Sequence, residues 1–244
     1  RLLVSDAQIG EVCQREGCAE LICCECLAEG VQHCAQHSPS REQKWEAAQQ
    51  RYRQGELPML LKSSTARLRE VNFLNRTQMR LDSIKTLLHP QTGEMLTIPD
   101  WSAHLEQHDE RAEIMRLQGK VILDTGMLAS TPLNVGLTYR LPAQKNQKGL
   151  PLEVHVQVLS RQANMLRDGF DTQPLSAERL QAHILRLNEA AQRGGAFQII
   201  VLAATTGWDA AARQILVGDG REKAFSHRQL LLYLFDLERS ELLF

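Results

Sequence analysis

Continuous apolar runs and helical spacing alternate in the C-terminal half of the chain. Three runs are mostly aliphatic: "LEVHVQVL" (152–159), "FQIIVLAA" (197–204) and "QLLLYLFDL" (229–237). Between them, "SAERLQAHILRLNEAAQR" (176–193) and "WDAAARQIL" (208–216) have the apolar spacing of helices. Apolar strands that alternate with helices are typical of a parallel sheet covered on both faces. With the short β-type runs "KVILDTG" (120–126) and "NVGLTYRL" (134–141), the pattern predicts a Rossmann-like α/β domain with a mainly parallel sheet over residues 120–244.

The middle of the chain, residues 40–119, has the spacing of helices. Ser40 is placed as an N-cap for a helix that ends before Gly55. Apolar residues then recur every three or four positions between Leu57 and Leu88, and a second helix is predicted over 102–118. The first of these long helices is mostly basic and the second mostly acidic. We therefore expect an antiparallel helical hairpin, or a coiled coil that joins two copies of the chain.

All six cysteines lie near the N-terminus, within "VCQREGCAELICCECLAEGVQHCAQH" (12–37). Short Cys-x2-Cys and Cys-x2-His spacings let two side chains of one turn reach a tetrahedral Zn2+ ion. The candidate ligand pairs are Cys13 with Cys18, Cys23 with Cys26, and Cys34 with His37. Because a closed Cys/His shell has no open coordination position, we expect structural zinc that folds a module over residues 1–39.

The segment "LICCECLAEGVQHCAQH" (21–37) resembles the B-box zinc finger in the order of its strand, Cys-x2-Cys knuckle, helical turn and closing His-bearing pair. The resemblance covers about a tenth of the chain. It implies interleaved pairs, in which Cys13 and Cys18 share an ion with Cys34 (or His33) and His37, while Cys23 and Cys26 serve a second ion. "RLLVSDAQIGE" (1–11) lacks the family's first Cys/His pair, so the chain holds one or two ions. For one ion, Cys13, Cys18, Cys34 and His37 are the first choice and a set with Cys23 and Cys26 the alternative, with Cys24 and His33 as bystanders.

A zinc module followed by long helices is also the order of tripartite-motif proteins, whose B-box lies beside a dimerising coiled coil. This similarity in layout implies self-association and a protein partner. Composition adds a formal net charge of -1, which gives nucleic-acid binding no general support. No apolar run is long enough for a membrane span and the first residues do not resemble a signal peptide, so we expect a cytoplasmic protein that does not bind membranes.

Polar residues follow the predicted parallel strands, where ligands bind in open α/β sheets. The loop "TTGWD" (205–209) is the strongest candidate, because hydroxyls and a glycine before a helix could present backbone N–H groups to an anion. Its candidate binding residues are Thr205, Thr206, Gly207 and Asp209; the alternative is that Thr206 or Asp209 only caps the helix. Ser160, Arg161, Asp236 and Glu238 follow the neighbouring strands. The sequence contains no Gly-rich dinucleotide or P-loop motif.

We predict no catalytic residues from the sequence. Glu153 and His155 share a strand face, as the acid and lysine of nuclease cores do, but His155 stands where the lysine belongs and Asp124 is the only candidate for the preceding aspartate. The leading hypothesis is a zinc-containing, non-enzymatic interaction protein that self-associates and uses its α/β domain for recognition or regulation. A nucleotide-responsive α/β domain and a nucleic-acid processing, nuclease-like factor are the alternatives.

Overall fold

The computed structural model divides into two compact units, residues 1–47 and residues 48–244, which we call the N-terminal unit and the α/β unit. The structure describes residues 9–12, 21–23, 39–112, 114, 125–142, 150–217 and 230–243. In the N-terminal unit, β1 (Ile9–Val12) pairs with β2 (Leu21–Cys23) in an antiparallel hairpin. Apart from the backbone of Cys23, the predicted zinc ligands lie outside the described residues.

Helix α2 (Arg41–Arg53) begins at the N-cap expected from the sequence. The Ser40 hydroxyl accepts a hydrogen bond from the Gln43 N–H at 3.2 Å, and the Gln43 side chain accepts one from the Ser40 N–H at 2.9 Å. This reciprocal pair is a capping box, which satisfies amide donors that the first turn of a helix leaves free. Gly55, at φ 76°, follows the helix in the left-handed conformation that glycine adopts without strain.

A six-stranded sheet forms the centre of the α/β unit, in the order β12-β11-β10-β8-β7-β6. Its strands are β6 (Leu105–His108), β7 (Gly136–Leu141), β8 (Leu152–Leu159), β10 (Phe197–Ala204), β11 (Leu230–Asp236) and β12 (Glu241–Leu243). Strands β8, β10 and β11 are parallel and correspond to the three apolar runs of the sequence. Strands β6, β7 and β12 run antiparallel to their neighbours. The sheet is therefore mixed rather than mainly parallel.

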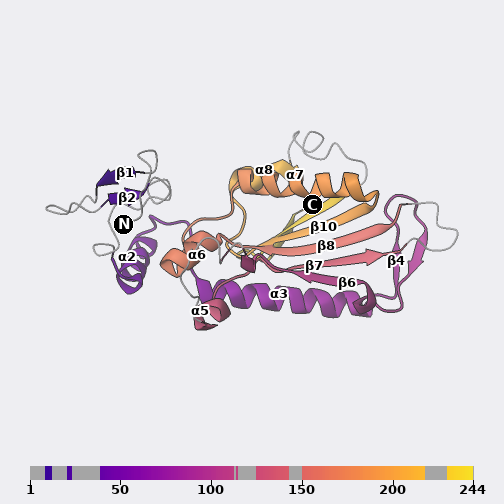
Figure 1. Ribbon diagram of the computed structural model, residues 1–244, viewed down its shortest axis with the longest axis horizontal. Helices are drawn as coiled ribbons and strands as arrows, with labels where there is room; N and C mark the ends of the chain where they lie inside the picture. The colour runs from indigo at the N-terminus through magenta and orange to yellow at the C-terminus, as the bar shows by residue number, and fades with distance from the viewer. Residues whose placement is uncertain are drawn as a thin grey trace. The chain divides into compact units, whose positions relative to one another are not determined.

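Helices cover both faces of this sheet, so the unit has three layers (Figure 1). Helix α3 (Ser63–Ser83) lies on one face, and α7 (Ala177–Gly194) and α8 (Ala210–Val217) lie on the other. On the α3 side, Leu74 packs with Tyr139 and Val156 in one apolar core. On the other side, residues of α7 and α8 pack with alternate side chains of β10 and β11 in a second core. Burial on both faces explains why β10 has a nearly continuous apolar sequence.

The helical hairpin predicted for residues 57–118 is not formed. Residues 102–108 form the 3-10 helix η2 (Ser102–His104) and strand β6, which pairs with β7. The chain between them and α3 forms a small hairpin of β4 (Thr86–Leu88) and β5 (Met95–Thr97). Part of the α3 apolar stripe is buried against the sheet, since Leu74 is only 6% exposed. The α/β unit therefore includes residues that the sequence pattern assigned to a separate helical segment.

Short elements bring the segment before α3 close to the end of β8. They are β3 (Leu61–Lys62), α5 (Thr125–Ser130), α6 (Gln162–Asp168) and β9 (Phe170–Asp171). Strand β3 pairs with β9, and Met59 and Leu61 pack with Met165 of α6 in a small apolar cluster. The start of α5 occupies the end of the predicted strand 120–126, whose other residues lie outside the described part of the chain. Within that described part, no helix has the length and apolar character needed to cross a membrane.

Candidate functional site

The loops that follow β8, β10 and β11 lie next to one another, because parallel neighbours end at the same edge of a sheet. The loops after β8 and β10 are joined directly, since the Ser160 and Thr205 hydroxyls are 2.7 Å apart. Thr205 also lies within hydrogen-bonding distance of the Leu159 carbonyl, at 3.4 Å, and is fully buried. Thr205 therefore links two loops and is not free for a ligand.

The Asp236 carboxylate organises the loop after β10. It lies at the end of β11, is 1% exposed, and accepts hydrogen bonds from the backbone N–H groups of Trp208, Glu238 and Arg239 at 2.9 to 3.3 Å. It also accepts one from the guanidinium of Arg213 at 3.1 Å. These donors compensate the cost of a buried charge.

Gly207 lets the loop after β10 pass close to this carboxylate. Its φ is 71°, and a Cβ atom at this position would lie 2.7 Å from an Asp236 carboxylate oxygen. A side chain here would be strained and would also collide with Asp236. The backbone conformation and the contact with Asp236 therefore explain why a glycine stands in the "TTGWD" sequence.

The N-terminus of α8 is already occupied by acidic groups of the chain itself. The Asp209 carboxylate accepts a hydrogen bond from the Ala212 N–H at 2.6 Å, so Asp209 caps the helix. The Trp208 N–H, one residue earlier, donates to Asp236. Two carboxylates at a helix N-terminus leave little attraction for another anion. The arrangement fits the capping alternative, and not an anion held by the first amides of α8.

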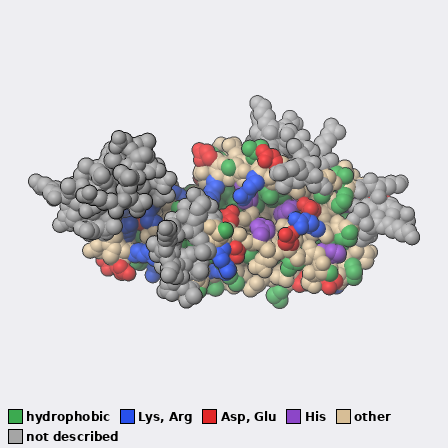
Figure 2. All heavy atoms as spheres, viewed as in Figure 1, with side chains coloured by type: hydrophobic (Ala, Val, Ile, Leu, Met, Phe, Trp, Pro, Cys, Tyr) green, Lys and Arg blue, Asp and Glu red, His purple; other side chains and the backbone are tan. Residues whose placement is uncertain are grey.

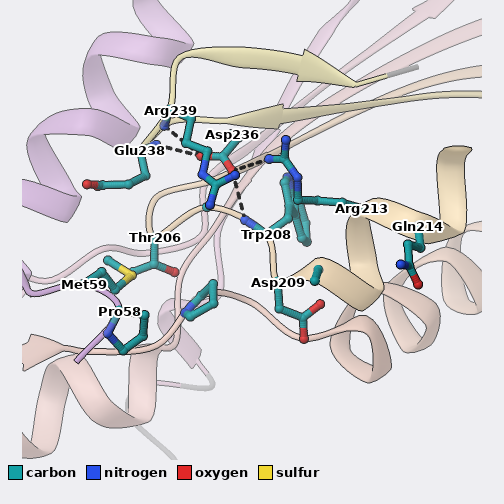
Figure 3. A pocket seen from close by; sticks show the side chains of 13 residues that line it. Pro58, Met59, Thr206, Trp208, Asp209, Arg213, Gln214, Asp236, Glu238 and Arg239 are labelled. Carbon is teal, nitrogen blue, oxygen red and sulfur yellow. Dashed lines mark hydrogen bonds and ion pairs between the residues drawn. The ribbon is translucent and has the colours of Figure 1, made fainter. Parts of the chain in front are cut away.

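A cavity of about 520 Å³ opens beside this loop, and we call it the edge cavity (Figure 3). It is lined by Pro58, Met59, Pro174, Thr206, Gly207, Trp208, Asp209, Ala210, Arg213, Gln214, Asp236, Glu238 and Arg239. A volume of this size suits a small organic ligand. Of the four predicted binding residues, Thr206, Gly207 and Asp209 line the edge cavity and Thr205 does not.

Thr206 and Arg239 are two of the polar side chains that the edge cavity offers to a ligand. Thr206 is 2% exposed, and its hydroxyl has no hydrogen-bond partner among the described residues. Arg239 is exposed, and its guanidinium has no partner in the described part of the chain. Figure 3 shows both residues at the same opening, whereas Glu238 points away from it. Glu238 pairs with Arg69 of α3 instead.

Sequence reasoning missed most of the other lining residues. Pro58 and Met59 precede α3 and are about 150 residues away from the loop that they face. The pairing of β3 with β9 and the packing of Met59 with Met165 bring them there. Arg239 could have been noticed, because it follows Asp236 and Glu238 at the end of the third apolar run.

The nuclease-like pair forms a hydrogen-bonded group on β7 and β8. A ring nitrogen of His155 is 3.2 Å from Glu153, and the other is 3.0 Å from the Thr138 hydroxyl. The hydrogen bond with His155 holds the pKa of Glu153 below its usual value, with further help from Arg140. In the described residues, no group of three His, Cys, Asp or Glu side chains is placed to hold a metal ion. Asp124 and the predicted zinc ligands lie outside these residues.

No protein-family model, curated protein or solved structure matches this chain.

Proposed function

We propose that this protein is a non-enzymatic recognition protein whose α/β unit binds a small organic anion of the nucleotide class in the edge cavity. The observation that carries the proposal is the Thr206 hydroxyl, which is buried at the edge cavity and has no hydrogen-bond partner among the described residues. A buried hydroxyl without a hydrogen bond costs free energy, and a ligand that bonds to it removes this cost. The edge cavity also lies at the carboxyl ends of parallel strands, where Rossmann-like domains bind their ligands.

The free groups of the edge cavity suggest the chemistry of the ligand. The Arg239 guanidinium suits a phosphate or carboxylate, because its planar donors pair with two oxygens at once. Pro58, Met59 and Pro174 offer apolar contacts for a base. We place the phosphate beside Arg239 and not at the α8 N-terminus, because Asp209 and Asp236 already use the amide groups there.

Recognition, rather than catalysis, fits the side chains around the edge cavity. Its described lining contains no histidine or cysteine to serve as base or nucleophile. The buried carboxylate, Asp236, is engaged with four donors. These groups can hold a ligand, and none is placed with a partner that would activate it.

The zinc module and assembly remain part of the proposal. Cysteine and histidine spacing supports structural zinc, and strand β2 leads directly into the Cys23-x2-Cys26 pair. A protein partner and self-association follow from the layout. For self-association, Leu68 of the α3 stripe is 59% exposed and could contact a second copy, whereas Leu74 is used in the core.

The ligand proposal is tested by thermal unfolding and calorimetry with a panel of nucleoside mono-, di- and triphosphates. A bound nucleotide at about 100 times its Kd should raise the Tm by roughly 5 to 10 °C. Thr206→Val should weaken binding about fivefold, and Arg239→Gln about tenfold or more, because each removes a contact with the ligand. Thr206→Val should unfold at the same temperature as wild type or higher when no ligand is present, since it removes an unpaired buried hydroxyl.

Thr65→Val and Arg111→Gln are matched controls, because both residues are exposed and neither lines the edge cavity. Both control variants should bind like wild type. The proposal is wrong if no nucleotide raises the Tm, or if binding survives unchanged in Thr206→Val and Arg239→Gln.

A further inference from the structure

A second cavity of about 580 Å³ lies between α3 and the sheet, and we call it the α3 groove. It is lined by Arg69, Asn72, Phe73, Arg76, Thr77, Arg80 and Leu81 of α3 and by Val201, Phe235, Leu237 and Ser240. The sequence predicted that an acidic helix over residues 102–118 would pack against this basic helix. The described residues 102–110 form η2, β6 and irregular chain instead, so they do not cover the arginines as a helix.

The charge of the α3 groove is of one sign. Its ionised lining residues are Arg69, Arg76 and Arg80, and no acidic side chain belongs to the described lining. Arg69 pairs with Glu238, but Arg76 and Arg80 are exposed and have no acidic partner among the described residues. They lie one helical turn apart on α3, so they present two positive charges on the same side of the helix.

This charge is local and does not reflect the whole molecule. The chain has a formal net charge of -1, and acidic and basic side chains mix on the face shown in Figure 2. Attraction of a polyanion must therefore come from a particular surface. The α3 groove brings three arginines together with no acidic side chain in its described lining.

The floor of the α3 groove is aromatic and apolar. Phe73 and Phe235 are half-buried, and their ring centroids are 5.2 Å apart with an interplanar angle of 51°. Leu81, Val201 and Leu237 surround them in the lining. Partly exposed phenylalanine rings can stack bases, while arginines that have no acidic partner among the described residues contact phosphates.

We propose that the α3 groove binds a short segment of single-stranded nucleic acid. Arg76 and Arg80 contact successive phosphates, and a base stacks on the Phe73–Phe235 floor. A double helix fits this surface poorly, because its bases are already paired and stacked and cannot reach the phenylalanines. An acidic peptide would satisfy the arginines but leave the aromatic floor without flat rings to stack on.

The α3 groove is distinct from the edge cavity. Arg69 lines the α3 groove and Glu238 lines the edge cavity, so the ion pair between them lies where the two sites meet. Arg69 also donates to the Thr205 carbonyl at 2.8 Å, which anchors α3 to the loop after β10. The variants chosen below lie in the α3 groove alone, so they leave the proposed nucleotide site intact.

The test uses fluorescence anisotropy with the full chain and labelled single-stranded DNA and RNA of about twelve nucleotides. Arg76→Gln/Arg80→Gln should weaken binding roughly tenfold or more and reduce the slope of log K against log salt concentration by about 1.4, because two phosphate contacts are lost. Phe73→Leu should weaken binding about fivefold or more with little change in this slope, because it removes stacking and no charge.

Arg51→Gln/Arg53→Gln on α2 is the matched control, since it removes the same charge from exposed positions outside the α3 groove. It should bind nearly as wild type does. The proposal is overturned if neither single strand binds at low salt, or if the two double variants lose affinity equally. It is also overturned if duplex DNA, or poly-glutamate of the same charge, binds as tightly as the single strand. Tight binding of poly-glutamate would point to an acidic peptide as the ligand.

Discussion

His183 is a buried histidine of α7. Its side chain is 7% exposed, one ring nitrogen lies 2.8 Å from the Arg186 guanidinium, and the other, Nε2, has no partner among the described residues. Burial, followed by the positive charges of Arg186 and Arg179, lowers the pKa of His183 to about 3. His183 therefore stays neutral in the folded protein at neutral pH.

We predict that His183 makes folding less favourable as the pH falls from about 6.5 toward 3. In this range the unfolded histidine, with a pKa of about 6.5, binds a proton that the folded one does not, so stability rises with pH. When the pH is lowered from 8 to 5, this group should lower the free energy of unfolding by about 2 kcal/mol. Urea unfolding of wild type and His183→Gln at several pH values measures the difference.

An NMR titration gives an independent measurement of the same group. The His183 ring signals should not move between pH 8 and pH 5 in the folded protein. A titration midpoint near 6.5, or equal pH dependence of stability in His183→Gln and wild type, contradicts the assignment.

At the scale of the element, a buried carboxylate fixes α3 to the segment before β7. Glu70 is fully buried and accepts hydrogen bonds from the backbone N–H groups of Leu133 at 3.1 Å and Val135 at 2.7 Å. It also pairs with Arg67, one turn earlier, at 2.5 Å. A helix that carries an ionised group at its buried face is held in one register, because any shift would leave the charge unpaired.

We predict that Glu70→Gln lowers the free energy of unfolding by about 2 to 4 kcal/mol, measured by urea denaturation. The amide removes the charge and turns one acceptor into a donor that faces a backbone N–H. Glu56→Gln is the control, because Glu56 forms only an exposed pair with Arg51. It should change stability by less than about 0.5 kcal/mol. A loss of the same small size in Glu70→Gln would rule out the anchoring role.

At the scale of the whole molecule, the chain has two compact units, and we expect different interactions to stabilise them. The α/β unit has an apolar core on each side of its sheet. The N-terminal unit, residues 1–47, contains all six cysteines. A unit of this size buries too little apolar surface to fold without help, and a bound metal ion can provide the missing free energy.

We predict one to two equivalents of Zn2+ per chain by elemental analysis. Cys13→Ser and His37→Ala should each lose an ion and make residues 10–40 sensitive to protease, because an incomplete shell no longer offsets the entropy of folding. The thermal transition of the α/β unit should persist in both variants. Cys24→Ser, at a bystander position, should keep its zinc. Metal-free protein, or a Cys13→Ser variant with full zinc content, would show that this ligand set is wrong. If only Cys23→Ser and Cys26→Ser release zinc, the alternative set is favoured.

The sequence by itself determined the elements whose local signals are strong. Strands β8 and β10 have the limits that their mostly aliphatic runs predict, because buried strands need apolar residues. Helix α2 begins at its capping box, which depends only on residues three positions apart. The position of the candidate site after β10 also followed from the sequence, since loops after neighbouring parallel strands share an edge.

Only the tertiary structure decided what depends on distant partners. The helical spacing over residues 102–108 did not produce an α-helix, because residues 105–108 pair with β7 as strand β6. Pro58, Met59 and Arg239 meet at the edge cavity, and Arg76 meets Phe235 at the α3 groove, although no local pattern connects them. Whether the Thr206 hydroxyl finds a partner is likewise set by neighbours in space, and none lies among the described residues. Hydrophobic periodicity reports which face of an element is buried, but not which other element buries it.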